Sequence, residues 1–133
     1  MYNLFLDDCR EPQDVTWVAL PLVNWTIARS YADFTRIICT LGMPLRLTFD
    51  HDLADEHYRE YQWAHSEQNF YKGKFNYDKL KEKTGYHCAQ WLVEYCMNKG
   101  LTIPEYYVHT MNPIGKQNII SVLESYKKSL TLP

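Results

Sequence analysis

The sequence lacks a long hydrophobic run. None of its segments approaches the ~18 consecutive apolar residues that a membrane-spanning helix needs. The first residues also contain no basic region followed by an apolar stretch and a small-residue cleavage site, so they do not resemble a secretory signal. These absences predict a protein without a membrane partner, and the cytoplasm is the expected compartment.

Paired cysteines and an excess of positive charge are missing too. The four cysteines (Cys9, Cys39, Cys88 and Cys96) form no C-x-x-C pair and lie mostly inside predicted elements, so we expect buried or half-buried thiols and neither a zinc site nor a disulfide framework. The formal net charge is -2. Proteins that bind duplex DNA by neutralising phosphates need positive charge, so stable duplex binding is not expected. A nucleotide or an RNA end remains a suitable partner, and the oligomeric state is left open.

The composition is that of a folded domain. Hydrophobic residues make up 46% of the 133 residues and charged residues 23%, which predicts one domain over residues 1–133 with a packed core. Periodicity predicts strands at 2–6, 25–29, 45–49 and 106–109, separated by helices or loops. The stretch 13–24 is irregular, and its residues 17–20 fit either a short helix or a buried loop.

Three helices have clear start signals. Ser30, Thr84 and Asn112 are N-cap residues by type and position, and Pro113 suits the first turn that follows Asn112. Gly42 and Gly100 end the first two helices. The resulting order is strand, loop, strand, helix, strand, insertion, helix, strand, helix. Right-handed crossovers then predict an open, mostly parallel α/β sheet.

Acidic residues follow two of the predicted strands. Asp7 and Asp8 come after the first, and Asp50, His51 and Asp52 come after the third. The carboxyl ends of neighbouring parallel strands meet at one crevice, so these acids are expected to lie together. Crowded carboxylates require a compensating charge, and oxygen ligands suit Mg²⁺ or Mn²⁺.

The fourth strand leads into a group of anion-binding residues. His109 and Thr110 end it, Asn112 caps the next helix, and Lys116 lies in the first turn of that helix. A helix N-terminus with free N–H groups and an ammonium is a ready site for a phosphate. His51 and His109 are candidates for moving protons, because imidazole is the side chain that changes charge near neutral pH.

Each of these residues also has a structural interpretation. Arg10 could hold an anionic substrate or simply pair with the acids beside it. His51 could act as an acid or base or only hydrogen-bond across the sheet edge. Lys116 could bind phosphate or remain solvated. The other histidines (His57, His65 and His87) are expected at the surface.

Residues 55–83 form an insertion that is long for so small a domain. It is either disordered or a flap over the strand ends, and local helix is plausible at 55–67. Its many aromatic residues favour packing, because disordered segments are usually poor in aromatics. The expected role of these aromatics is to cover the crevice, by stacking on a base or excluding water.

Four motifs together resemble one family. They are Leu-Asp-Asp-x-Arg-x-Pro, Thr-Phe-Asp-His-Asp-Leu, Thr-Gly-Tyr-x-x-Ala-x-Trp-Leu and His-x-x-Asn-Pro-x-Gly-x-x-Asn-Ile, spread from end to end of the chain. They resemble the cyclic-phosphate-processing receiver-like domain, a group of domains that is found in bacteria and phages and is associated with RNA repair. The resemblance implies a receiver-like (flavodoxin-like) sheet of about four to five strands flanked by helices. It also implies an acidic Mg²⁺ pocket at Asp7, Asp8 and Asp50.

The expected function is a metal-dependent phosphoesterase that acts on a cyclic phosphate, at an RNA 2′,3′-cyclic phosphate end or in a cyclic nucleotide. The alternative is a non-catalytic module, either a nucleotide-binding or a phospho-receiver domain. The expected residues divide by role as follows: catalytic Asp50, His51 and His109; phosphate-binding Arg10, Thr84, Thr110, Asn112 and Lys116; metal-binding Asp7, Asp8, Asp50 and Asp52, with Mg²⁺ or Mn²⁺ as the cofactor.

Overall fold

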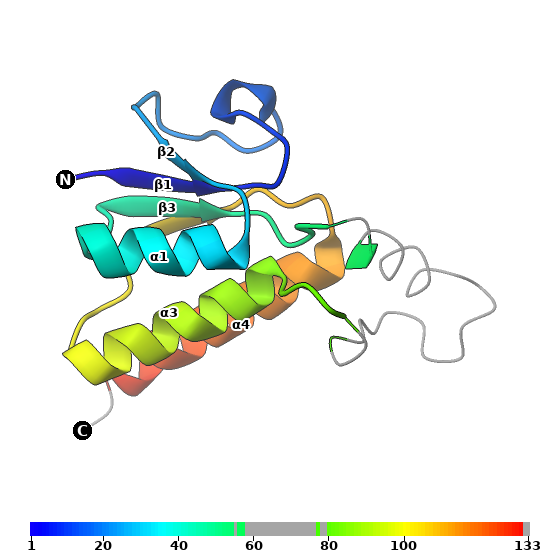
Figure 1. The fold of residues 1–133 in the computed structure, drawn as a ribbon. Helices are drawn as coiled ribbons and strands as arrows, with labels where there is room; N and C mark the ends of the chain where they lie inside the picture. The colour runs from blue at the N-terminus through cyan, green and yellow to red at the C-terminus, as the bar shows by residue number, and fades with distance from the viewer. Residues whose placement is uncertain (55, 58–76, 78–79, 132–133) are drawn as a thin grey trace.

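The computed structural model of the chain describes residues 1–54, 56–57, 77 and 80–131. These residues contain one sheet, three long helices and a 3-10 helix (Figure 1). The strands are β1 (Asn3–Leu6), β2 (Thr26–Ala28), β3 (Arg46–Phe49) and β4 (Glu105–Val108). The helices are α1 (Tyr31–Leu41), α3 (Gly85–Lys99) and α4 (Pro113–Ser129), and the 3-10 helix is η1 (Pro12–Asp14).

The four strands are all parallel and lie in the order β2-β1-β3-β4. Leu4 of β1 lies beside Thr26 of β2 and Leu47 of β3, and Leu47 lies beside Tyr106 of β4. The predicted α/β, receiver-like fold with a parallel sheet is therefore confirmed. Since the strands are parallel, the loops that follow them meet at one edge of the sheet.

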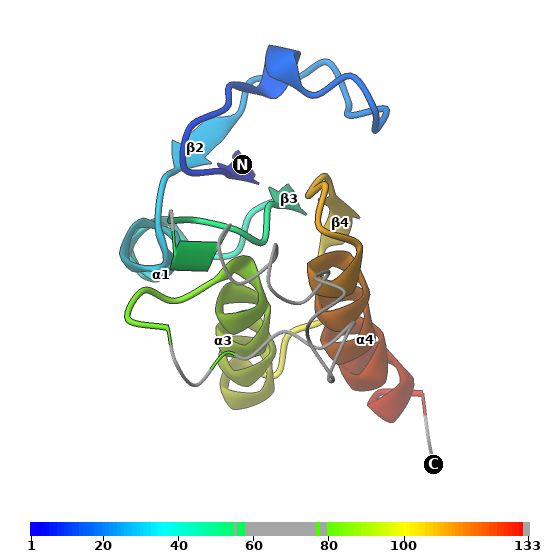
Figure 2. The ribbon, with the colours of Figure 1, turned by 90° about the vertical axis from the view of Figure 1, so that its right-hand side faces the viewer.

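The two faces of the sheet are covered by different kinds of structure. Helices α1, α3 and α4 lie on one face, and the loop from residue 7 to residue 25 passes over the other (Figure 2). Leu4, Leu6 and Leu47 pack into the core shared with the helices. Phe5, the intervening residue of β1, is equally buried and meets the ring of Trp25 edge-on, with centroids 6.4 Å apart. Burial on both faces explains why Leu4, Phe5 and Leu6 of β1 are all apolar.

The predicted caps start the helices as expected. The Ser30 hydroxyl accepts a hydrogen bond from the Asp33 N–H at the start of α1, and the Asn112 side chain accepts one from the Gly115 N–H at the start of α4. Thr84 caps α3 through the N–H of His87. A cap of this kind stabilises a helix by about 1 kcal/mol. Each cap joins residues three positions apart, so these helix starts can be recognised from the sequence alone.

Two predictions about burial were wrong. Cys9 and Cys39 are exposed, because one lies in a loop and the other lies on the outer side of α1; Cys88 and Cys96 are buried as expected, and all four are free thiols. His57 is fully buried and not at the surface. Its Nδ1 accepts a hydrogen bond from the Leu53 N–H at 2.7 Å, and its Nε2 bonds to the Glu82 carbonyl at 2.8 Å.

Most of the predicted insertion lies outside the described residues, as does His65. Of the helix expected at 55–67, Glu56 and His57 are helical in the described part. Residues 17–20 form neither a helix nor a buried loop, since Trp17 is 39% exposed. No helix in the described part of the chain is both long and apolar enough to cross a bilayer.

Candidate functional site

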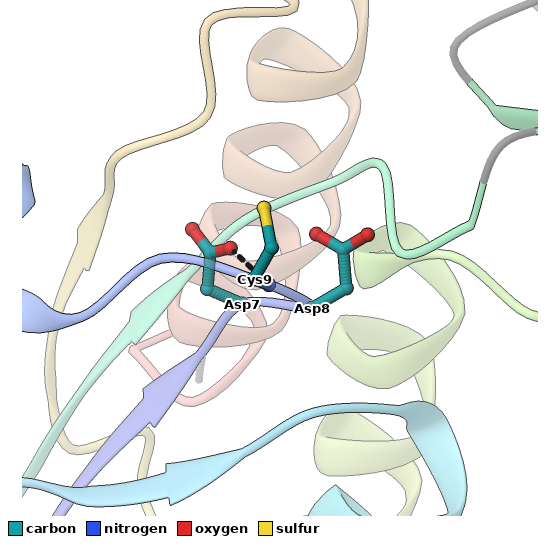
Figure 3. Close-up of side chains that lie close together, drawn as sticks. All are labelled: Asp7, Asp8 and Cys9. Carbon is teal, nitrogen blue, oxygen red and sulfur yellow. Dashed lines mark hydrogen bonds between the residues drawn. The ribbon is translucent and has the colours of Figure 1, made fainter.

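The predicted acids and histidines meet at the C-terminal edge of the sheet. Asp7 follows β1, Asp50 follows β3 and His109 follows β4, and the three side chains are almost completely buried. Asp8 is half-buried beside Asp7, and Figure 3 shows their two carboxylates with the Cys9 side chain between them. Parallel pairing of the strands therefore brings together groups up to 102 residues apart in the sequence.

Asp7 is held by several donors. Its Oδ1 accepts hydrogen bonds from the N–H groups of Cys9 at 3.0 Å and Arg10 at 2.9 Å, and its Oδ2 lies 3.0 Å from Nε2 of His109. Burial alone would raise the pKa of Asp7, but the bonds from His109, Arg10 and Cys9 outweigh it and lower the pKa to about 2. Asp7 is therefore a stable negative charge.

Asp50 is less well satisfied. Its Oδ1 accepts the His51 N–H at 2.8 Å, whereas its Oδ2 is buried and has no hydrogen-bond partner among the described residues. Burial and the charge of Asp7 raise the pKa of Asp50 to about 7, while the His51 N–H and the Thr110 hydroxyl act in the opposite direction. An unpaired buried carboxylate oxygen costs stability unless something else compensates it.

Arg10 is the cation that lies beside these acids. Its Nη1 is 3.5 Å from Oδ2 of Asp7 and 3.9 Å from Oδ2 of Asp50. Its guanidinium also lies over the ring of Trp17, with Cζ 5.1 Å from the ring centroid. Trp17 is held in turn by a 2.7 Å hydrogen bond from its Nε1 to the His109 carbonyl. We call Asp7, Asp50, Arg10 and His109 the acid cluster.

Both ring nitrogens of His109 have partners. Nε2 meets Asp7, and Nδ1 lies 2.7 Å from the Thr48 hydroxyl. Burial lowers the pKa of His109 despite the neighbouring Asp7. A neutral ring beside an ionised Asp7 carries its proton on Nε2, so Nδ1 accepts from Thr48. The ring also stacks on Phe5, with centroids 4.7 Å apart, which fixes its orientation.

His51 belongs to a separate group of hydrogen bonds. Its Nδ1 lies 2.7 Å from Oδ1 of Asp52, and its Nε2 lies 2.8 Å from the hydroxyl of Tyr77. The amide of Asn112 donates to both oxygens of Asp52, at 3.3 and 3.4 Å, and Asn118 donates to the Tyr77 hydroxyl at 2.9 Å. We call these five residues the His51 network.

Two glycines allow the helices to approach the loop after β3. A Cβ at Gly115 would overlap the His51 ring, and a Cβ at Gly85 would overlap the carbonyl of Asp50. The N–H of Gly85 donates to the His51 carbonyl at 2.8 Å. The sequence signal for these positions was a glycine in the first turn of each of two predicted helices, but its reason is visible only in the structure.

The phosphate-binding residues expected at the helix starts lie in different surroundings. The hydroxyl of Thr84 is buried and bonds to His87 at the start of α3. Thr110 is close enough to Asp50 to lower its pKa, and its hydroxyl accepts the Asn112 N–H at 3.2 Å. Asn112 accepts the Gly115 N–H at 3.0 Å, so part of the expected anion site is already used. Lys116 is exposed.

The tightest grouping of potential metal ligands in the described chain differs from the expected set. One ligand atom each from Asp7, Asp8 and Cys9 lies within 4.8 Å of the others (Figure 3). Asp50 is not a member of this group, although Arg10 lies near both Asp50 and Asp7, and Asp52 is bonded within the His51 network. A thiol is a poor ligand for Mg²⁺, so the carboxylates of Asp7 and Asp8, and not Cys9, would bind this cation.

Sequence reasoning missed two contributors to the site. Tyr77 was counted only among the aromatics of the insertion, and Trp17 only as part of an irregular stretch. Both reach the site through long-range bonds: Tyr77 bonds to Nε2 of His51 and to Asn118, and Trp17 donates to the His109 carbonyl. No local pattern in the sequence marks these bonds.

Comparison with known proteins identifies a family. Residues 2–125 match the family described as the Cyclic-phosphate processing Receiver domain. No curated protein matches the chain, and no solved structure does. The match covers nearly the whole chain and agrees with the parallel sheet flanked by helices. The chain therefore belongs to the cyclic-phosphate processing receiver domain family.

Proposed function

We propose that this domain is a divalent-cation-dependent phosphoesterase that acts on a cyclic phosphate, either in a cyclic nucleotide or at an RNA end. The observation that supports it best is Oδ2 of Asp50, a buried carboxylate oxygen that lies near the ionised Asp7 and accepts no hydrogen bond from the part of the chain that the structure describes. Buried groups left unsatisfied are uncommon and are often found at functional sites. A bound cation would remove this imbalance.

The residues present fit Mg²⁺ or Mn²⁺. Asp7, Asp8 and Asp50 would hold the cation, since they offer oxygen atoms from two neighbouring loops at the edge of the sheet. Bound there, the cation would neutralise charge that develops on the phosphoryl oxygens. Asp52 was expected as a further ligand, but its bonds to His51 and Asn112 give it a structural role in this proposal.

The other groups of the chain bind and orient the phosphate. Arg10 lies beside the acids, Thr110 lies close to Asp50, and Lys116 is exposed in the first turn of α4. Such groups meet the phosphate in the ground state as well as in the transition state, so they contribute mainly to affinity. Thr84 would act indirectly, because its hydroxyl already caps α3 and thereby fixes the helix that touches Asp50.

The acid–base roles of His51 and His109 stay predictions. Both rings are fully buried, and both nitrogens of each already have partners. A ring that transfers a proton to or from the substrate must therefore first break one of these hydrogen bonds. For His51 this is the bond to Tyr77, and for His109 it is the bond to Asp7 or to Thr48. In the cation-free protein, the role of His109 that the contacts support is orienting Asp7.

The same burial favours a second candidate function. A module that binds a cyclic phosphate without cleaving it needs the acids and the phosphate-binding groups but no accessible proton donor. A phospho-receiver that uses Asp50 as the acceptor is a further form of this alternative. Both differ from the enzyme in a single measurable property, which is turnover.

The experiment incubates the protein with 2′,3′- and 3′,5′-cyclic nucleotides and cyclic-phosphate RNA ends, with Mg²⁺ or Mn²⁺ and with a chelator. We expect cation-dependent opening of at least one substrate, and a loss of about 10²-fold or more in Asp50→Asn. Asp14→Asn makes the same change at an exposed carboxylate and should behave as the parent. Binding without turnover would support the second function, and neither binding nor turnover would contradict both.

A further inference from the structure

The guanidinium of Arg10 lies where a cation would be needed. Its Nη1 lies 3.5 Å from Oδ2 of Asp7 and 3.9 Å from Oδ2 of Asp50, and within residues 1–54, 56–57, 77 and 80–131 the latter atom makes no hydrogen bond. One positive group thus approaches two nearly inaccessible carboxylates. This is also the place that the proposed function, on which the inference rests, gives to a divalent cation.

We propose that Arg10 and the divalent cation compete for the acids, and that the cation releases Arg10 to bind a phosphoryl oxygen of the substrate. Like charges a few ångströms apart in partly buried surroundings repel strongly. A divalent cation between Asp7 and Asp50 therefore forces the guanidinium to move. A guanidinium fork freed beside a bound phosphate suits bidentate binding of its oxygens.

The contacts of Arg10 with the acids are loose enough to exchange. Strong charge-assisted bonds from nitrogen to oxygen measure about 2.7 to 2.9 Å, and both contacts here are longer. The Arg10 side chain is also 25% exposed, so it has solvent on one side into which it can turn. Neither property is expected of an arginine that serves only as a permanent structural partner of buried acids.

Arg10 keeps a support that does not involve the acids. Its Cζ lies 5.1 Å from the centroid of the Trp17 ring, and its Nη2 lies 3.7 Å from the sulfur of Met111. The indole is fixed by its bond to the His109 carbonyl, although 39% of Trp17 is exposed. Trp17 can therefore carry the guanidinium at the rim of the site after its release, close to where phosphate binds.

Competition has a thermodynamic consequence that can be measured. If Arg10 opposes the cation, its removal must strengthen cation binding in the absence of phosphate. If released Arg10 then binds phosphate, the cation must strengthen phosphate binding, and phosphate must strengthen cation binding by the same factor. Without Arg10 this mutual strengthening should shrink to what the cation and the phosphate contribute directly.

Calorimetry with Mg²⁺ alone tests the first consequence. Arg10→Ala should bind Mg²⁺ about fivefold or more tightly than the parent, within the usual range of coupling between sites. Arg36→Ala removes the same charge from a side chain that pairs with Asp33 on α1, and it should bind Mg²⁺ as the parent does. Titration with inorganic phosphate at saturating Mg²⁺ should then show weaker binding in Arg10→Ala.

Tryptophan fluorescence tests the inference in the parent itself, in case Arg10→Ala does not fold. Mg²⁺ should change the emission of Trp17, with the same midpoint as in calorimetry, and the change should disappear in Trp17→Phe. A parent that binds no cation contradicts the proposed function and this inference together. A parent that binds Mg²⁺ with unchanged Trp17 emission, or an Arg10→Ala variant that binds it no more tightly, contradicts the inference alone.

Discussion

The acid cluster and the His51 network each pair a buried carboxylate with a buried imidazole, yet they are satisfied to different degrees. In the acid cluster, no described residue donates a hydrogen bond to Oδ2 of Asp50, and Nη1 of Arg10 lies 3.9 Å from it. In the His51 network, both ring nitrogens and both oxygens of Asp52 have partners within 3.4 Å. Fully satisfied buried polar networks make a structure rigid. In an incomplete network, an unpaired polar atom is costly and can be paired by a bound ligand.

The position of the two groups explains this difference. The His51 network joins the loop after β3 to α4, through Asn112 and Asn118, and to Tyr77. It thereby fixes the backbone directly after Asp50. The acid cluster uses that fixed backbone to present Asp50 beside Asp7. We infer that the network positions the acids and that the cluster binds the ligand, and the predictions below test this division.

The largest expected effect comes from the two histidines. If they act as acid and base, His51→Ala and His109→Ala should each lower turnover by roughly 10² to 10⁴-fold with substrate affinity near that of the parent. His109→Ala should also change Mg²⁺ affinity more than His51→Ala does, because Nε2 of His109 contacts the proposed cation ligand Asp7, whereas the His51 ring bonds to Asp52 and Tyr77. Steady-state kinetics and calorimetry on both variants provide the comparison.

His57→Ala is the matched control for the histidines. His57 is equally buried, but its bonds go to Leu53 and Glu82, so it should lose stability and keep its turnover once folded. If a double variant in which His51 and His109 are both replaced keeps normal turnover, the cation alone accounts for catalysis, and the acid–base prediction is contradicted. An equal change of Mg²⁺ affinity in both single variants would contradict the division into two regions.

The next effect tests the packing of the His51 network. Gly115→Ala places a methyl group into the His51 ring, which is buried and cannot retreat, so unfolding free energy should fall by about 2 to 4 kcal/mol. Gly100→Ala meets open space but has φ at +67°, so it should lose only about 1 kcal/mol. Urea unfolding of both variants gives the comparison, and equal losses would mean that His51 can move.

A pH dependence should separate the two acids in the cation-free protein. The folded-state pKa of Asp50 is raised from 3.8 to about 7, so its contribution to stability is complete below pH 3.8 and is lost as the pH rises to about 7. For Asp7, whose pKa is lowered to about 2, the contribution is present above pH 3.8 and is lost as the pH falls towards 2. The two acids therefore act on stability with opposite signs.

Substitution isolates the effect of Asp50 from that of other titrating groups. The stability of Asp50→Asn relative to the parent should rise between pH 4 and pH 7, by on the order of 2 to 4 kcal/mol, because the amide avoids the buried charge. Saturating Mg²⁺ should cancel this advantage by stabilising only the parent. Urea unfolding across pH measures both, and a flat difference would show that Asp50 is compensated without a cation.

The sequence predicted what is decided locally. The caps at Ser30, Thr84 and Asn112 depend on residues three positions apart. The strand that ends at Asp7 follows from its apolar character, and the strand that ends at Asp50 follows from alternation of apolar and polar residues. A parallel sheet then requires the acids to converge, so their convergence could be predicted from the sequence.

What the sequence could not predict is decided by distant contacts. The bonds from His109 to Asp7 and from Trp17 to the His109 carbonyl join residues 102 and 92 positions apart. The burial of His57 depends on the Glu82 carbonyl, which lies beyond a stretch outside the described residues. Similarly, the sequence does not show that Oδ2 of Asp50 is left unsatisfied while Asp52 is fully bonded, because this depends on how Arg10 and Asn112 are placed in three dimensions.

The smallest expected effect concerns Lys116. Its substitution tests whether this side chain contacts the phosphate directly or only attracts it through its charge. Lys116 is exposed in the first turn of α4, so its charge is well screened, and Lys116→Ala should weaken phosphate binding only about two- to fivefold. That loss should shrink further at high salt. Lys127→Ala, at the other end of α4, removes the same charge and should leave binding unchanged. If Lys116→Ala weakens binding as strongly as Arg10→Ala does, and equally at all salt concentrations, the lysine contacts the phosphate directly, and α4 belongs to the binding region together with the acid cluster.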